Sequence, residues 1–367
     1  MSNYLVTLTP IDKFFFGADM MFSVKGQDER YSSYIIESLM FPQQTSLLGM
    51  LRFLLLKNAD DLFDGSNIRH DKKDDVEKLI GPTSFSVKNA GKETNDFGKI
   101  KRLHRCFVRC ETSDGQIHNL DFLGFDSQYS SGNAHDIKCC INGREVSLPN
   151  LKDYSAKTEY KRILSDGSMK LNLNLEDVFI EDRRIGIQRD IYTGKTSDSG
   201  LFKQISYRFN NKDCKYSFAF YLEADLDNLD KYSGQVVSVG ADSSQFVIAV
   251  TPAKISDLPD VEDADECKLI LKSPAYIDAD TVSMADWMFT DTIPFRFLET
   301  SVRMTDNYSV LSRKHDGKEL VAPKRSTKYE LYAGGSVFHF ESSEIKKDFI
   351  AKLASYEGFR QIGYNEF

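Results

Sequence analysis

The sequence lacks the features that mark secreted and membrane-spanning chains. Its longest apolar run, Leu47 to Leu56, is interrupted by Gly49 and Arg52 and is far shorter than the roughly 20 residues of a membrane span. The first residues show no basic start followed by an apolar core, as a secretory signal would. Six cysteines in 367 residues form no disulfide framework. We therefore expect a cytoplasmic protein without membrane contact.

The motifs of common catalytic sites are also missing. The chain has no P-loop, no dinucleotide-binding fingerprint, no nucleophile elbow and no zinc-protease histidine pair. None of its six histidines lies in the apolar segment 46–57, which removes that segment as a source of a general base for RNA cleavage. We predict that the protein is not an enzyme and has no cofactor. Acid–base catalysis by groups distant in sequence stays open.

One group of residues deserves comparison with a metal site. Seven possible ligands lie within residues 104–140: His104, Cys106, Cys110, His118, His135, Cys139 and Cys140. Zinc takes such ligands, but an adjacent cysteine pair is an unusual spacing, because neighbouring side chains of a strand point to opposite faces. We therefore predict reduced cysteines, packed or half exposed, and no metal.

The hydrophobic pattern predicts an α+β fold with antiparallel sheets. Strands are expected at 4–9, 216–224, 236–240, 245–251, 268–272 and 337–341, the third and fourth forming a hairpin. A buried helix should follow Thr45 or Ser46 as its N-cap and end near Lys57. An amphipathic helix over 344–356, capped by Ser343, should close the chain.

Two domains are expected. Residues 1–226 form the first, with a large irregular insertion at about 60–166 and an arm at about 183–215. Residues 227–367 form the second, because the strand pattern stops in the acidic segment 225–230 and a new hairpin follows. The segment 88–166 is rich in Gly, Ser, Asn and Asp, so we expect it to elaborate the first domain.

The buried helix carries one polar stripe. Ser46, Gly49 and Arg52 are spaced three residues apart and should stack on one face. Gly49 then predicts a close approach to the helix backbone, either by a packed neighbouring element or by a ligand.

Charge is distributed unevenly along the chain, whose net charge is −8. Residues 183–215 hold eight Lys or Arg against three Asp or Glu, whereas residues 216–266 hold two against eleven. The basic segment interleaves its cations with glycines and aromatics, which suits RNA because cations neutralise phosphates and aromatics stack on bases. A plain solvated face is the alternative. A second basic stretch lies at 313–328, and glycines bracket Arg360 and Gln361 near the end of the chain.

Several short motifs together resemble one family. They are Leu8-Thr9-Pro10-Ile11-Asp12 with Phe15-Phe16-Gly17, Ser46 to Arg52, Gly186-Ile187-Gln188-Arg189-Asp190, Thr193-Gly194-Lys195, Gly200-Leu201-Phe202, Ser273-Pro274-Ala275, Ala333 to Val337 and Gly358 to Gly363. In this order they resemble the RAMP proteins of CRISPR systems, and among them the 5′-handle-binding subunit of the type III-B (Cmr) effector complex. The family's Arg-Asp-Gly turn is absent, since Gly17-Ala18-Asp19 stands there.

The resemblance implies two ferredoxin-like (RRM-like) domains, the second ending in a glycine-rich loop. It also implies a non-catalytic subunit that binds the repeat-derived 5′ tag of the guide RNA in antiviral defence. The implied protein partners are the large polymerase-like subunit and the backbone RAMP subunit, with target RNA met only indirectly. The RNA-binding candidates are Arg52, Arg183, Arg184, Gln188, Arg189, Tyr192, Lys195, Phe202, Gly334, Gly335, Gly358, Arg360, Gln361 and Gly363.

Two other functions compete with this one. A RAMP endonuclease that processes guide-RNA precursors would need a general base near the RNA. A purely structural subunit would contact protein only. The RNA-holding hypothesis further expects Arg52, Arg184, Arg189, Lys195 and Arg360 to converge on one RNA path.

Overall fold

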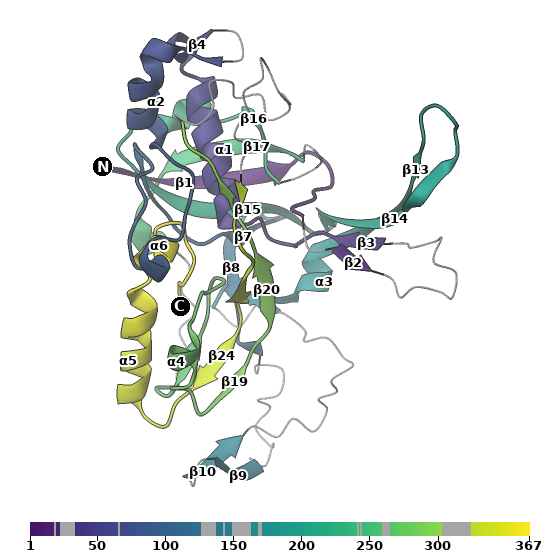
Figure 1. Cartoon of the computed structure of the whole chain (residues 1–367). Helices are drawn as coiled ribbons and strands as arrows, with labels where there is room; N and C mark the ends of the chain where they lie inside the picture. Colours follow the sequence, from purple (N-terminus) through teal and green to yellow (C-terminus); the bar gives the residue numbers. More distant parts are fainter. Residues whose placement is uncertain are drawn as a thin grey trace.

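The largest element of the computed structural model is an antiparallel sheet of nine strands, counted over the described residues (Figure 1). The structure describes residues 1–17, 20–22, 34–64, 67–125, 137–141, 144–148, 163–167, 171–240, 242, 244–258, 265–302 and 324–367. The spatial order is β12-β11-β8-β7-β15-β1-β17-β16, and β6 also pairs with β15. The bounds are β1 Ser2–Pro10, β6 Ile100–Leu103, β7 Phe107–Thr112, β8 Ile117–Phe122, β11 Ile163–Ser165, β12 Asn172–Asn174, β15 Cys214–Ala224, β16 Val236–Ser238 and β17 Gln245–Pro252.

Helix α1, Gln44–Lys57, packs on one face of this sheet and forms the main core with it. Leu47, Leu51 and Leu54 of the helix join Val6 of β1 and Phe218 of β15, all at most 4% exposed. Burying each such side chain contributes about 1.5–3 kcal/mol. The helix begins earlier than predicted: its N-cap is Gln43, and the predicted caps lie within the first turn.

Part of the segment predicted to be irregular belongs to this sheet, which corrects the insertion over about 60–166. β7 pairs with β15 from Thr112 to Phe107, and β8 pairs with β7. Val108 and Leu120 point into the core at 0% exposure. Polar residues such as Arg109, Asn119 and Asp121 interrupt these strands, and this concealed them from the hydrophobic pattern.

The predicted hairpin after residue 230 also belongs to this sheet. β17 pairs with β1 from Pro252↔Tyr4 to Phe246↔Pro10, and β16 pairs with β17. The strands therefore continue one sheet across residues 225–230, where the domain boundary was expected.

A smaller unit follows in the chain. β18 Lys268–Ile270 and β19 Trp287–Phe289 flank β24 Val337–His339. α5, Ser343–Ala354, covers this sheet and contributes Phe349 and Leu353 to a separate core. Its N-cap is Ser342, whose hydroxyl accepts a hydrogen bond from the Ile345 amide at 3.4 Å, one residue before the predicted cap.

A third sheet stands out from the body as an arm (Figure 1). Its order is β13-β14-β3-β2, with bounds β13 Phe179–Arg189, β14 Thr196–Phe209, β3 Tyr34–Glu37 and β2 Met20–Phe22. The remaining elements are β4 Phe63–Asp64, β5 Asn67–Ile68, β9 Ile137–Ile141, β10 Arg144–Leu148, β20 Thr292–Phe295, β21 Leu298–Glu299, β22 Lys324–Arg325, β23 Tyr329–Tyr332, α2 Lys73–Ile80, α3 Leu175–Val178, α4 Ala279–Val282 and α6 Glu357–Arg360, with short 3₁₀ turns between them. The predicted α+β class with antiparallel sheets is confirmed.

Candidate nucleic-acid interface

The polar stripe of α1 faces a hollow of about 430 Å³. Ser46, Gly49 and Arg52 line it together, and Arg52 donates from Nη2 to the Gly81 carbonyl at 3.3 Å. A Cβ built on Gly49 would meet no atom within 4 Å. The close approach expected at Gly49 is therefore not made by any described part of the chain, and the glycine opens onto the hollow.

The opposite wall comes from the far end of the sequence. In the extended run 295–298, Phe295 and Phe297 point into the core, whereas Arg296 and Leu298 are exposed. Arg325 of β22 lies opposite Leu298 of β21 in the ladder, so their side chains share a face. Arg296, Leu298 and Arg325 thus face the hollow together.

The charge of this hollow is of one sign. Three guanidinium groups line it, from Arg52, Arg296 and Arg325, and none of its described lining residues is acidic. Within the ranges that the structure describes, neither Arg296 nor Arg325 makes an ion pair. Guanidinium groups bind phosphate with paired N–H donors, so the hollow is suited to a phosphate group.

Replacing Gly49 with alanine is expected to raise the free energy of unfolding by about 0.5–1 kcal/mol. Alanine is the better helix former, and its methyl group has room. Urea denaturation of the isolated protein measures this change. A lower stability would show that a part of the chain contacts Gly49 after all.

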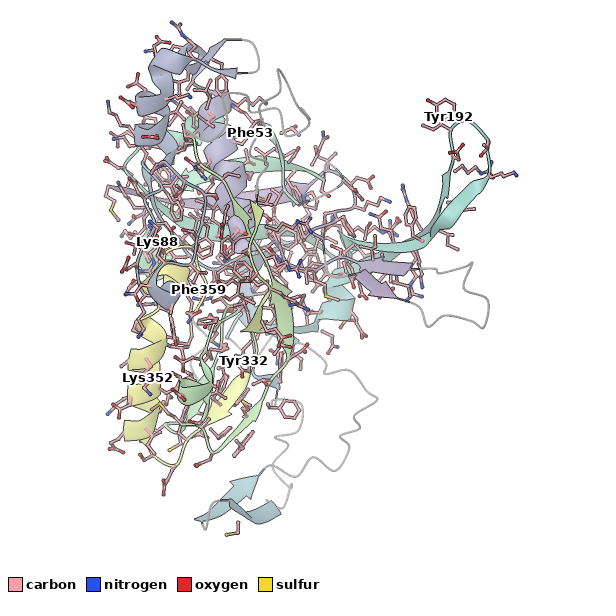
Figure 2. The ribbon with its side chains drawn as sticks, viewed as in Figure 1. Phe53, Lys88, Tyr192, Tyr332, Lys352 and Phe359 are labelled. Carbon is pink, nitrogen blue, oxygen red and sulfur yellow. The ribbon has the colours of Figure 1, made fainter. Side chains whose placement is uncertain are left out.

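The arm holds four of the predicted residues at or beside its turn. Asp190 accepts hydrogen bonds at its Oδ1 from the amides of Tyr192 and Thr193, at 3.0 and 2.7 Å. The hydrogen bonds from Thr193 hold the pKa of Asp190 below its usual value. Tyr192 is 96% exposed at the tip (Figure 2), and Arg189 and Lys195 flank the turn, both exposed. This geometry presents an aromatic ring between two cations. The side chain of the fourth residue, Gln188, lies outside the described part.

The arginines at the base of the arm have acidic neighbours. Arg183 donates from Nε to Glu181 at 2.6 Å, and Nε of Arg184 lies 3.5 Å from Asp182. Both guanidinium groups remain more than 60% exposed. They are available to a ligand only in competition with these carboxylates.

Phe202 is held within the arm. It lies opposite Gly186 in the ladder, and a Cβ on Gly186 would come within 2.1 Å of its ring. The ring therefore covers the glycine, as aromatic side chains often do in sheets. Phe202 is half-buried by this contact.

The four predicted glycines outside the arm are packed against the body. Gly334 and Gly335 lie under Phe122 and Phe125, where a Cβ would come within 2.9 and 2.5 Å of a ring. Cβ atoms on Gly358 and Gly363 would meet backbone atoms of Glu93 and His104, at 2.5 and 2.6 Å. Each glycine permits a close internal contact, which is a structural reason for it.

The loop after α5 is similarly engaged. Gln361 accepts from the Asn95 amide at 2.8 Å and donates to the Asn95 carbonyl at 2.8 Å. Arg360 pairs with Glu357 at 3.4 Å and lines a second hollow, of about 400 Å³, with Arg102 and His104. The structure therefore does not bring Arg360 into the hollow of Arg52, and the predicted residues lie in several separate places.

The structure adds two residues, Arg296 and Arg325, to the predicted RNA-binding residues. Arg325 lies in the basic stretch 313–328, whereas Arg296 had no sequence signal.

The possible metal ligands have other partners where they are described. His104 lies 2.9 Å from Glu223 and 3.3 Å from Glu366, and His118 lies 2.8 Å from Asp166. Over the described residues no group of three or more His, Cys, Asp or Glu is placed to hold a metal ion. His135 and the side chain of Cys139 fall outside those residues.

No described helix has the length and apolar character to cross a membrane.

Comparison with known proteins gave matches to a family and to solved structures, whereas no curated protein matches. Chains in two cryo-EM structures, "Type III-B Cmr-beta bound to cognate target RNA and AMPPnP, state 1" and "Type III-B Cmr-beta bound to cognate target RNA", are each 17% identical. Both matches cover 99% of this chain, with 94% and 95% of those chains and TM-scores of 0.44 and 0.46. A chain in a Cmr-beta apo structure is 11% identical over 69% of this chain and 98% of its own, with a TM-score of 0.29.

The family match covers both long strands of the arm, β13 and β14, and everything that follows them. The family described as "CRISPR-associated protein (Cas_Cmr3)" matches residues 144–367, which is more than half of the sequence. The match includes the arm and the segment that carries Arg296 and Arg325. This protein therefore belongs to the Cas_Cmr3 family, a subunit family of the type III-B Cmr complex of CRISPR systems.

Proposed function

We propose that this subunit binds the repeat-derived 5′ tag of the guide RNA and bridges the large subunit of the effector complex to its backbone. The observation that carries the proposal is the arginine-lined hollow beside α1. Arg52, Arg296 and Arg325 gather around it with no acidic lining residue among those described. RNA carries a phosphate at every nucleotide, so such a surface favours its backbone over neutral ligands.

The arm supplies a second kind of contact. Tyr192 at its tip can stack on an unpaired base, and Arg189 and Lys195 can neutralise phosphates on either side. Together the hollow and the arm would fix the course of a single strand without reading its sequence. The net charge of −8 is compatible with this function, because local basic surfaces, such as the three arginines of the hollow and the eight Lys or Arg of residues 183–215, can bind RNA on an acidic protein.

We propose further that the subunit holds RNA without cutting it. Cleavage beside a 2′-hydroxyl needs a general base within reach of that hydroxyl. No histidine or tyrosine is among the described residues that line the hollow of Arg52. The supporting residues are cations and hydroxyls, which position a phosphate.

We also propose that the chain has two ferredoxin-like halves. The helix-covered sheet of β1, β15 and β17 supports the first, and the sheet of β18, β19 and β24 with α5 supports the second. Because β17 pairs with β1, the division is better placed between β17 and β18 than at residue 226.

The test is salt-dependent binding of a labelled guide RNA with its 5′ tag to the assembled complex. Replacing Arg296 and Arg325 with alanine should lower the slope of log K against log salt by about 1.4, at roughly 0.7 per phosphate of a single strand. A variant with Arg69→Ala and Lys78→Ala loses the same charge near α2, outside the hollow, and should keep the wild-type slope. Arg189→Ala with Lys195→Ala tests the arm in the same assay.

Each result has a definite meaning. Equal slopes for the hollow variant and its control would overturn the assignment of the hollow to RNA. Cleavage of the RNA by the wild type, seen on a gel of the same samples, would replace the proposal by the endonuclease function. An unchanged slope in the hollow and arm variants together would favour a subunit that contacts protein only.

A further inference from the structure

Strand β13 forms an edge of the arm sheet. It pairs with β14 along one side from Phe179 to Arg189, and it stands last in the order β13-β14-β3-β2. Among the described residues no strand pairs with its other side. In an antiparallel ladder, every second residue directs its backbone N–H and C=O away from the neighbour. The outer side of β13 therefore presents unpaired donors and acceptors over much of an 11-residue strand.

This edge carries exposed aliphatic side chains. Ile185 is 77% exposed and Ile187 is 52% exposed, and their spacing of two residues places both on one face. Ile191, at 94%, continues the apolar surface into the turn. Natural edge strands usually carry charged side chains, prolines or bulges that prevent pairing with other chains. In β13 the charged residues stand at 181–184 and 189 and the irregular register begins only beyond Ile187, so the stretch from Ile185 to Ile187 has neither.

The chemistry of this face differs from that of the opposite face. On the isoleucine face, the charge of Arg183 is engaged by Glu181 at 2.6 Å, and Lys203 lies opposite Ile185. The opposite face carries Arg184, whose Nε lies 3.5 Å from Asp182, and the ring of Phe202 above Gly186. Bases stack on aromatic rings and guanidinium planes, which aliphatic side chains do not provide. The isoleucine face is thus suited to protein, and the opposite face to RNA.

The surrounding charge indicates the composition of the partner. Residues 183–215 hold eight Lys or Arg against three Asp or Glu. An acidic segment would be attracted to this arm, and its apolar residues would cover the isoleucines. Addition of a strand to an exposed edge is a common mode of peptide recognition, in which backbone hydrogen bonds give affinity and alternate side chains give specificity.

We propose that the outer edge of β13, from Arg183 to Arg189, pairs with an extended acidic segment of a neighbouring protein subunit of the complex. That segment becomes a fifth strand beside β13. Its apolar side chains contact Ile185 and Ile187, and its carboxylates lie near the cations of the arm. This interface goes beyond the proposed binding of RNA, because it requires no nucleic acid.

The experiment uses the full chain and the purified protein subunits of its complex, first without RNA. Replacing both Ile185 and Ile187 with lysine is expected to weaken assembly at least tenfold, measured as the protein concentration for half-assembly in mass photometry. Lysine is a natural protector of edge strands. It also adds positive charge, so the variant should bind RNA at least as well as the wild type. A loss of assembly can then not be attributed to lost phosphate contacts. Ile117→Lys, which places the same change at a 52% exposed isoleucine of β8 outside the arm, is the control and should assemble normally.

Hydrogen exchange on the same samples gives the second measurement. Amides of the peptide 180–190 should exchange more slowly once the protein subunits assemble, before any RNA is added. Protection that arises only with guide RNA would assign the edge to RNA and overturn the proposal. Protection in the isolated protein at high concentration, with dimers in mass photometry, would assign it to a second copy of this chain. Unaltered assembly of the lysine variant would also overturn the proposal. None of these outcomes depends on the salt slope measured for the hollow.

Discussion

Replacing Arg105 with methionine is expected to lower the free energy of unfolding by about 3–5 kcal/mol. Arg105 is 4% exposed and donates from Nε to Asp121 at 3.1 Å and from Nη1 to Glu366 at 3.0 Å. Methionine fills a similar volume but leaves both carboxylates buried without their cation. The loss of stability comes mainly from those uncompensated charges.

This cluster also links the large sheet to the C-terminal segment. Arg105 precedes β7 in the large sheet, whereas Glu366 lies next to the last residue of the chain. His104 contacts Glu366 as well, at 3.3 Å. The variant should therefore release the final segment from the sheet and increase hydrogen exchange there.

The contribution of Glu366 should depend on pH. Burial alone would raise the pKa of Glu366, but hydrogen bonding to His104 and the charge of Arg105 outweigh it and lower the pKa below its ordinary value of 4.5. A carboxyl group with a lowered pKa stabilises the folded state above its ordinary value, and this stabilisation is lost as pH falls through the folded pKa. The wild type should lose stability as the solution is acidified below about 4.5, and the Arg105→Met variant should lose less.

Urea denaturation of both proteins between neutral and acidic pH measures the two effects together. The exposed Arg69, which pairs with Asp71 at 3.3 Å, offers a control, since Arg69→Met removes the same charge from the surface. If the two variants were equally stable, the buried cluster would contribute no more than a surface ion pair.

Replacing Gly363 with alanine should be the most damaging glycine substitution among the predicted RNA-binding residues. Its φ is +85°, a conformation that costs an L-residue roughly 1–2 kcal/mol. A Cβ would also lie 2.6 Å from the carbonyl carbon of His104, and backbone cannot move aside as a side chain can. Such overpacking costs about 1–3 kcal/mol more.

Gly194 provides a matched control. Its φ is +65°, but a Cβ there would meet no atom within 4 Å. Gly194→Ala should therefore show the conformational cost alone, and the difference between the two variants in thermal denaturation isolates the steric part. Equal losses for both glycines would show that residues 103–105 and the C-terminal loop separate at little cost.

Several elements could be predicted from local sequence because their patterns are strong. β15 alternates Tyr216, Phe218 and Phe220 toward the core, and α1 is apolar on most of its surface. Both patterns report burial directly. β7 and β8 gave no such signal, because polar residues alternate with a few core residues and only pairing with β15 decides that they are strands. The helices begin with N-caps one to three residues before the predicted ones, and Gln43 caps α1 without any side-chain hydrogen bond, so no capping side chain marked that end.

The sequence by itself determined the family, the α+β class, the position of the arm and the one polar stripe on α1. These features depend on residues close together in the chain, whose spacing is visible without a fold. Only the tertiary structure decided where the candidate RNA contacts lie. Arg325 reaches the stripe of Arg52 because β22 pairs with β21, and Arg296 lines the same hollow from the residues just before β21. Gly358 and Gly363 instead make close contacts within the protein. A guanidinium group binds phosphate only where the surrounding surface leaves it exposed and unopposed, and that surface is assembled from segments more than 200 residues apart.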